Sequence, residues 1–208
     1  MYDELKKIYE EKKHEIRKRL EGFKSIKDDR ELFSELAFCL CTPQSKAVEC
    51  DKAVRMLSSN GLLFNGSERH IRPFLNKIRF YENKSRYIVE AREKFFKDNV
   101  FSLKEKIFSM PAEKAREWLV ENVKGFGYKE ATHFLRNIGL ANELAILDRH
   151  VLRCLVDFKV IDEMPKSLTP KKYIEIEKKM KEFSEKIEIP MDELDFVFFY
   201  RQTGEIFK

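Results

Sequence analysis

The chain has 208 residues, which is enough for one domain or for two small helical lobes. Charged residues make up 37% of it, but 36 acidic residues offset 41 basic ones and leave a net charge of +5. That balance is compatible with nucleic-acid binding without indicating it. No apolar run approaches the roughly 20 residues that span a membrane, and no signal-peptide pattern stands at the N-terminus. We therefore expect a cytoplasmic protein with no membrane association.

Helical spacing and helix-end signals cover almost the whole chain. The pattern predicts a charged helix over 2–21 that Gly22 stops. A second helix starts at Asp28 or Asp29 and ends at Thr42-Pro43, and a third is capped by Ser45 and runs to about Ser58. No strand stands out, so the predicted fold class is all-α. The further predicted helices span about 67–77, 81–97, 102–108, 112–123, 128–137, 149–158, 170–187 and 190–200.

Two other features narrow the possible functions. The cysteines, at positions 39, 41, 50 and 154, have neither zinc-pair nor iron–sulfur spacing, so we expect buried or free thiols and no metal. A set of basic residues around the predicted helix 81–97 forms either a patch for nucleic acid or ordinary solvated helix faces. This set comprises Lys77, Arg79, Lys84, Arg86 and Arg92.

A tight hairpin is predicted between the helices 112–123 and 128–137. Gly125 and Gly127 lie at its turn, where glycine accepts unusual dihedral angles and leaves the backbone N–H groups open to a phosphate. Lys129 follows in the first turn of the second helix, where the helix dipole disfavours its ammonium form. A lysine that loses its proton beside bound DNA is a candidate nucleophile.

Asp148, nineteen residues after Lys129, is a candidate partner for this lysine. An amine that attacks the anomeric carbon of a nucleotide displaces the base, while a carboxylate stabilises the positive charge on the sugar. The resulting imine permits strand cleavage by β-elimination. Two plainer interpretations stay open: Lys129 is a surface residue, or Asp148 only caps the helix at Arg149 by accepting from the N–H near Val151.

Two segments, KGFGYKEATHFLRNIG from Lys124 and ILDRHVL from Ile146, carry a resemblance to a known family. They resemble the helix-hairpin-helix DNA glycosylase superfamily, and within it the compact 8-oxoguanine DNA glycosylase/AP lyases of archaea and thermophilic bacteria. The resemblance implies that Lys129 and Asp148 are the nucleophile and its carboxylate partner. It also implies a central lobe over 27–141 that holds the hairpin motif (about 112–139), a second lobe formed by 1–26 and 142–208, and an active site between the lobes.

The resemblance implies a role for three more regions. The segment LCTPQSK, from Leu40, is similar to the loop that fills the gap left by an extruded base, with Gln44 as the inserted side chain and Ser45 and Lys46 beside it. Phe80 and Phe199 are expected to stack on the base, and the C-terminal Lys208 to fold toward it. The alternatives are an ordinary turn with a solvated Gln44, two core phenylalanines and a frayed C-terminus.

The implied protein is therefore a monomeric repair enzyme that associates with the nucleoid and excises 8-oxoguanine from double-stranded DNA. It needs no cofactor, although the superfamily suggests a monovalent cation on the carbonyls of the hairpin. One alternative is a pyrimidine-directed glycosylase of the same superfamily, which commonly carries a C-terminal iron–sulfur loop; no cysteine follows Cys154 here. The other is a non-catalytic DNA-binding hairpin protein, which only holds phosphates.

Overall fold

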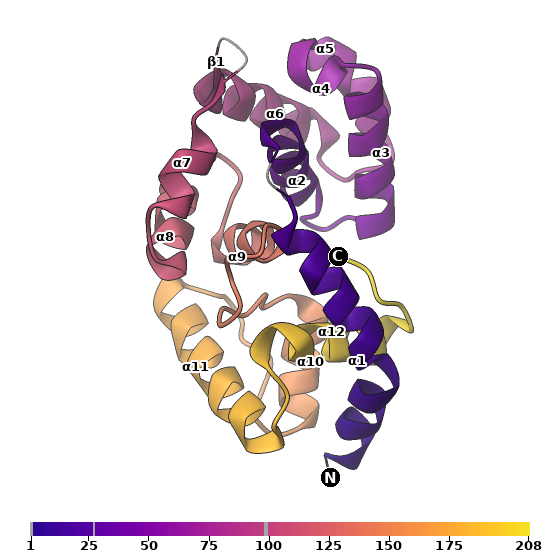
Figure 1. Ribbon diagram of the computed structural model, residues 1–208, viewed down its shortest axis with the longest axis vertical. Coiled ribbons are helices and arrows are strands. Elements are labelled where there is room, and N and C mark those ends of the chain that lie inside the picture. Colours follow the sequence, from indigo (N-terminus) through magenta and orange to yellow (C-terminus); the bar gives the residue numbers. More distant parts are fainter. Residues whose placement is uncertain (1, 27, 98–99) are drawn as a thin grey trace. The chain divides into compact units, whose positions relative to one another are not determined.

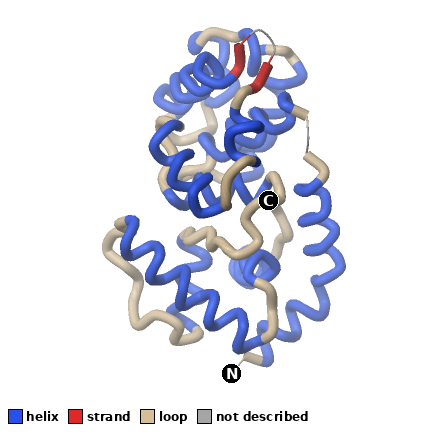
Figure 2. Tube along the Cα trace, turned by 60° about the vertical axis from the view of Figure 1, so that its left-hand side comes forward, coloured by secondary structure: helices blue, strands red, loops and turns tan. Residues whose placement is uncertain are grey.

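The computed structural model describes residues 2–26, 28–97 and 100–208 and is largely helical (Figures 1 and 2). Two compact units divide the chain. The terminal unit consists of Met1–Ser25 and Gly139–Lys208, and the central unit of Ile26–Ile138. Both ends of the chain therefore belong to one unit.

Four helices build the terminal unit: α1 (Asp3–Lys24), α10 (Arg149–Asp157), α11 (Pro170–Ile187) and α12 (Met191–Thr203). Helix α12 packs against each of the other three. Three rings, those of Phe158, Phe183 and Phe198, form a stacked cluster with centroids 6.2–6.3 Å apart. An aromatic core thus joins α11 and α12 to the end of α10.

Helix α1 continues past Gly22, where we predicted its end, and stops at Lys24. Phe23 explains the difference, because it is buried and its ring stacks 6.4 Å from that of Phe196 in α12. Burying one phenylalanine contributes about 1.5–3 kcal/mol. A glycine inside a helix costs only about 1 kcal/mol. The favourable burial is the larger of the two, so the helix runs on.

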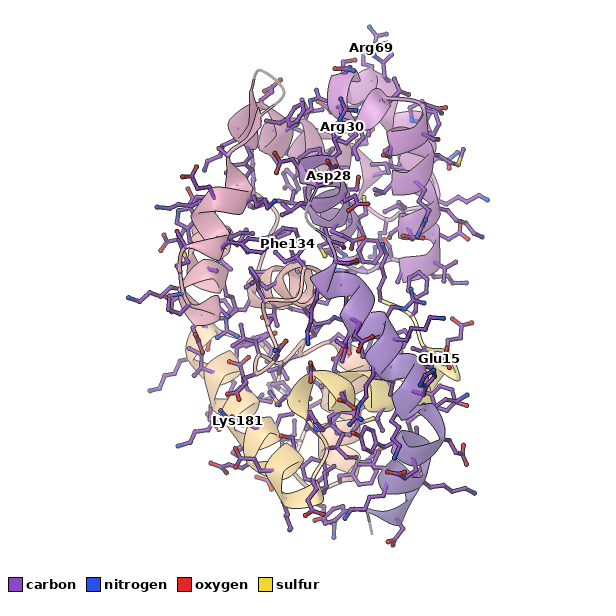
Figure 3. The ribbon with its side chains drawn as sticks, in the orientation of Figure 1. Glu15, Asp28, Arg30, Arg69, Phe134 and Lys181 are labelled. Carbon is purple, nitrogen blue, oxygen red and sulfur yellow. The ribbon has the colours of Figure 1, made fainter. Side chains whose placement is uncertain are left out.

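The central unit is built around α2 (Asp29–Cys41), which contacts α3, α6 and α9. Asp28, labelled in Figure 3, begins this helix. Its side chain accepts hydrogen bonds from the N–H groups of Arg30 and Glu31. The last six residues of α2 are all buried, which makes it the core helix of this unit. The other helices here are α3 (Ala47–Ser59), α4 (Leu62–Asn65), α5 (Glu68–Ile71), the 3-10 helix η1 (Arg72–Leu75), α6 (Tyr81–Phe95), α7 (Leu103–Phe108), α8 (Ala112–Asn122) and α9 (Tyr128–Asn137).

Three local features of this unit differ from the prediction. Helix α4 was not predicted, and the expected helix 67–77 is split into α5 and η1, with Pro73 in the first turn of η1. Proline lacks an N–H and so favours a break there. A two-residue antiparallel ladder, β1 (Phe96–Lys97) with β2 (Val100–Phe101), follows α6. Apart from this ladder, the all-α prediction is confirmed.

Across the described parts of the chain, no helix combines the length and the apolar character needed to cross a membrane.

Candidate active site

The hairpin between α8 and α9 turns at Gly125, whose φ of +94° lies in the region that favours glycine. A Cβ there would come within 2.5 Å of the Tyr87 ring. Gly127 has an ordinary extended conformation, with φ −108°, which any residue can adopt. The expectation that both glycines have unusual dihedral angles was therefore wrong for Gly127. Its N–H donates to Glu130 Oε2 at 3.2 Å, which fixes the start of α9. Phe126, between the two glycines, is buried against Phe134.

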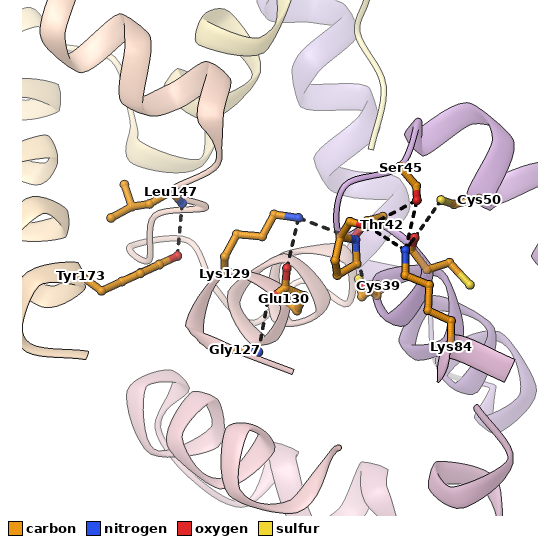
Figure 4. A network of polar contacts seen from close by, with 12 residues as sticks. Cys39, Thr42, Ser45, Cys50, Lys84, Gly127, Lys129, Glu130, Leu147 and Tyr173 are labelled. Carbon is orange, nitrogen blue, oxygen red and sulfur yellow. Dashed lines mark hydrogen bonds and ion pairs between the residues drawn. The ribbon is translucent and has the colours of Figure 1, made fainter. Parts of the chain in front are cut away.

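Lys129 lies in the first turn of α9, with 22% of its side chain exposed. Its Nζ is 3.5 Å from Thr42 Oγ1 and 3.6 Å from Glu130 Oε1 (Figure 4). Thr42 Oγ1 in turn donates to the carbonyl of Cys39 at the end of α2. The amine is therefore held between two elements of the central unit, and Lys129 is not an ordinary solvated surface lysine.

His133 lies one helical turn after Lys129 and is buried. Its ring meets that of Phe38 edge-on, with centroids 5.5 Å apart. The position within the core favours a structural role for this histidine over a role in tuning the lysine.

The loop between α2 and α3 presents Gln44 to solvent in a left-handed conformation, with φ +53°. Such a conformation costs about 1–2 kcal/mol outside glycine. Ser45, expected to cap the next helix, does not do so: α3 begins at Ala47 without a side-chain cap. Its Oγ instead accepts from Lys84 Nζ at 3.1 Å and from the backbone N–H of Arg79 at 3.0 Å. Lys46 is exposed beside this loop.

Of the basic residues around α6 that were candidates for a nucleic-acid patch, Lys77, Arg79 and Arg86 are exposed, whereas Lys84 and Arg92 are not. Lys84 is only 4% exposed, and Arg92 donates to the carbonyl of Leu63. Arg86 lies 3.7 Å from Glu90. Arg86 therefore fits the interpretation as part of an ordinary solvated helix face. The buried Lys84 belongs neither to such a face nor to a surface patch for nucleic acid.

Asp148 belongs to the terminal unit and is the N-cap of α10. Its Oδ1 accepts from the N–H groups of His150 and Val151, both at 2.8 Å, which confirms the predicted cap. Within the described residues no hydrogen bond reaches Oδ2. The buried Tyr173 steadies the preceding segment, since its hydroxyl accepts from Leu147 N–H and donates to the Ala145 carbonyl (Figure 4). One carboxylate oxygen thus caps the helix and the other stays available.

The three expected base-pocket residues lie as follows. Phe80 is 51% exposed and has φ +59°, with the Arg79 guanidinium 4.9 Å from its ring centroid, so it is not a core residue. Phe199, in α12, is partly exposed and meets His150 edge-on at 5.6 Å. Lys208 ends the non-helical segment that follows Gly204 and is partly exposed.

All four cysteines are buried, and none of them forms a disulfide. Burial raises the pKa of the Cys50 thiol to about 11, and that of Cys41 further still. Cys50 Sγ donates to the carbonyl of Cys41 at 3.2 Å. The described residues hold no group of three or more His, Cys, Asp or Glu side chains suited to a metal ion.

Comparison with known proteins gives the family. The family profile described as 8-oxoguanine DNA glycosylase matches residues 16–189. An 8-oxoguanine DNA glycosylase/AP lyase of Fusobacterium nucleatum is 48% identical over 212 residues, which cover 100% of this chain and 97% of that protein.

Two solved structures are similar along nearly their whole length. The Methanocaldococcus jannaschii 8-oxoguanine glycosylase/lyase, in complex with a 15mer DNA containing 8-oxoguanine, gives a TM-score of 0.87 at 36% identity and covers 98% of this chain and 99% of that one. The 8-oxoguanine DNA glycosylase of Thermotoga maritima gives 0.85 at 30% identity, with 99% and 97% covered. The hairpin with its half-buried lysine, the aspartate that caps α10 and these matches lead to one conclusion: the chain belongs to the family of 8-oxoguanine DNA glycosylase/AP lyases.

Proposed function

We propose that Lys129 and Asp148 carry the chemistry of this 8-oxoguanine DNA glycosylase/AP lyase. The neutral Nζ of Lys129 attacks C1′ of the deoxyribose, and the bond from C1′ to the base breaks. The base leaves with that electron pair and gains a proton. Asp148 Oδ2 stabilises the positive charge that builds up on the sugar before the new bond is complete.

This first step leaves the Lys129 nitrogen bonded to C1′ of the closed sugar ring. The nitrogen then loses its protons as the C1′–O4′ bond breaks and O4′ takes up a proton, which gives an imine between Lys129 and the opened sugar. The imine acidifies the C2′ hydrogen, so a base removes that proton and the 3′ phosphate leaves, which cleaves the strand. Water then releases the lysine. These steps require an amine that reaches the substrate in its uncharged form and a carboxylate oxygen not engaged elsewhere.

The position of Lys129 carries the proposal. Its amine is mostly shielded from solvent, beside a glycine turn, and its contacts with Thr42 and Glu130 restrict where it points. A restricted amine approaches a bound sugar with little loss of entropy. The unused Oδ2 of Asp148 supports a second role for that residue in addition to capping.

We further propose double-stranded DNA with 8-oxoguanine as the substrate, because the similar archaeal enzyme has been solved with a DNA that contains this base. In this proposal the backbone N–H groups near Gly125 and Gly127 contact phosphate, and the carbonyls there accept a monovalent cation. Gln44 fills the gap left by the base, with Lys46 on the nearby backbone, and the Phe80 and Phe199 rings stack on the base. Lys208 contacts the base from the C-terminus.

Borohydride trapping on a duplex with one 8-oxoguanine tests the proposal. Borohydride reduces the imine to a stable amine, so we expect a covalent protein–DNA adduct with the unmodified enzyme. Lys129→Gln should lose both the adduct and strand cleavage and keep its affinity for DNA.

Lys124→Gln is the matched control, because Lys124 is an exposed lysine of the same hairpin that pairs with Glu90 at 3.2 Å. It should still form the adduct. Strand cleavage retained by Lys129→Gln would remove this lysine from the mechanism.

A further inference from the structure

Lys84 is a buried cation that the chemistry above does not use. It lies in α6, is 4% exposed, and its ammonium donates to the carbonyls of Cys41 and Pro43, both at 2.7 Å, and to Ser45 Oγ at 3.1 Å (Figure 4). Burial lowers the pKa of this lysine from its ordinary value. Among the described residues no carboxylate pairs with it, so neutral oxygens alone compensate for its lost hydration.

All three acceptors belong to one short stretch of chain. Pro43 and Ser45 flank Gln44 on either side, and Cys41 is the last residue of α2. Ser45 Oγ receives a second hydrogen bond from the N–H of Arg79, just before α6. The ammonium therefore ties the loop to α6 on both sides of Gln44 and leaves the Gln44 side chain itself exposed.

The three hydrogen bonds from Lys84 to Cys41, Pro43 and Ser45, here called the clamp, hold the loop in a conformation that it would not favour unaided. Gln44 has φ +53°, which is unfavourable for a residue with a Cβ, and persists only when its surroundings impose it. Hydrogen bonds to a charged donor are the stronger kind, and three of them converge on the residues next to Gln44. Gln44 therefore combines an exposed side chain with a strained backbone on a firmly anchored loop, which suits it to entering a gap in stacked bases.

We propose that Lys84 is a positioning residue for base extrusion: its ammonium fixes the loop of residues 42–46 so that Gln44 enters the space vacated by the flipped base. This inference rests on the proposed function, in which Gln44 has that role. Lys84 acts through Gln44 and does not touch the reacting atoms. It should therefore matter when a stacked base has to leave the helix, and matter little once the base is gone.

The test compares extrusion with the later chemistry in Lys84→Met, which keeps a side chain of similar length but loses all three hydrogen bonds. Extrusion is followed by the fluorescence of 2-aminopurine placed beside 8-oxoguanine, in a Lys129→Gln background where no chemistry occurs. We expect the rate of the fluorescence rise to fall by about tenfold or more, since extrusion costs a few kcal/mol and loses its support. Cleavage of a preformed abasic site, measured with Lys129 present, should stay within about threefold, because no base has to leave the stack.

A double-mutant cycle asks whether Lys84 works through Gln44. Gln44→Ala should slow extrusion to a similar degree, and adding Lys84→Met to it should slow extrusion little further. Fully additive effects would show that Lys84 acts by another route and would overturn the proposal. Equal losses on 8-oxoguanine and on the abasic site would do so too, since a merely structural lysine affects both.

Two further variants keep the test decisive. Ser45→Ala removes one acceptor of the clamp and should show a smaller defect of the same kind, which replaces Lys84→Met if that variant does not fold. Lys94→Met is the matched control: Lys94 lies in the same helix and donates two hydrogen bonds to Asn122, at 2.9 Å each, away from the loop. It should leave extrusion unchanged. Trapping of the unmodified enzyme on the abasic duplex checks the proposed function separately, because that reaction requires Lys129 but no extrusion.

Discussion

Asp148 has two carboxylate oxygens in different situations. Oδ1 accepts hydrogen bonds from the N–H groups of His150 and Val151 at the start of α10, and Oδ2 accepts no hydrogen bond from the described residues. Asparagine presents the same kind of oxygen to those N–H groups and is about as good a cap as aspartate. It has no negative charge to offer a sugar cation. The two roles of this residue are therefore separable by substitution.

Asp148→Asn is expected to change the free energy of unfolding by less than about 0.5 kcal/mol. Excision should fall by about 100-fold or more, as when other preorganised electrostatic groups are removed from an active site. Asp148→Ala should lose a similar amount of activity and about 1 kcal/mol of stability as well. Chemical denaturation and single-turnover excision measure the two quantities. An active but unstable Asp148→Asn would leave capping as the only role of this residue.

At the scale of single elements, the hairpin depends on one of its glycines far more than on the other. Gly125 has φ +94°, and a Cβ there would meet the Tyr87 ring at 2.5 Å. Gly127 has extended dihedral angles, and the nearest atom to its added Cβ would be Glu130 Oε2 at 3.2 Å, the end of a flexible side chain. We expect Gly125→Ala to destabilise the protein by about 1–3 kcal/mol and Gly127→Ala by less than about 1 kcal/mol. Thermal unfolding of the two variants measures this, and equal losses would contradict the assignment.

Signals that act within a few residues were predictable from the sequence. The caps at Asp28 and Asp148 are both present, because each side chain meets N–H groups two and three residues further on. Ser45 was predicted to cap in the same way, but its hydroxyl is taken by Lys84, 39 residues away. A partner at that distance leaves no mark on local spacing. The clamp on the Gln44 loop therefore could not be predicted, whereas Lys129 and its hairpin could.

At the scale of the whole molecule, the first and last helices of the chain, α1 and α12, pack against each other in the terminal unit. Arg17 in α1 donates to both carboxylate oxygens of Glu193 in α12, 176 residues later, at 3.1 and 3.2 Å. Periodicity predicted both helices but gave no information on their pairing, which depends on matching surfaces far apart in sequence. Of the two proposed catalytic groups, Lys129 belongs to the central unit and Asp148 to the terminal unit.

Each unit has a core of its own, and this leads to a prediction about how the molecule loses structure. Ile16 in α1 and Leu57 in α3 are fully buried aliphatic residues, one in the terminal unit and one in the central unit. Truncating such a side chain to alanine costs about 2–5 kcal/mol. Because α1 packs on α12, Ile16→Ala should speed amide hydrogen exchange in α10, α11 and α12 more than in α2 and α6. Leu57→Ala should give the opposite pattern. Peptide-resolved mass spectrometry measures both, and a uniform rise across the chain in each variant would show that the two units unfold as one.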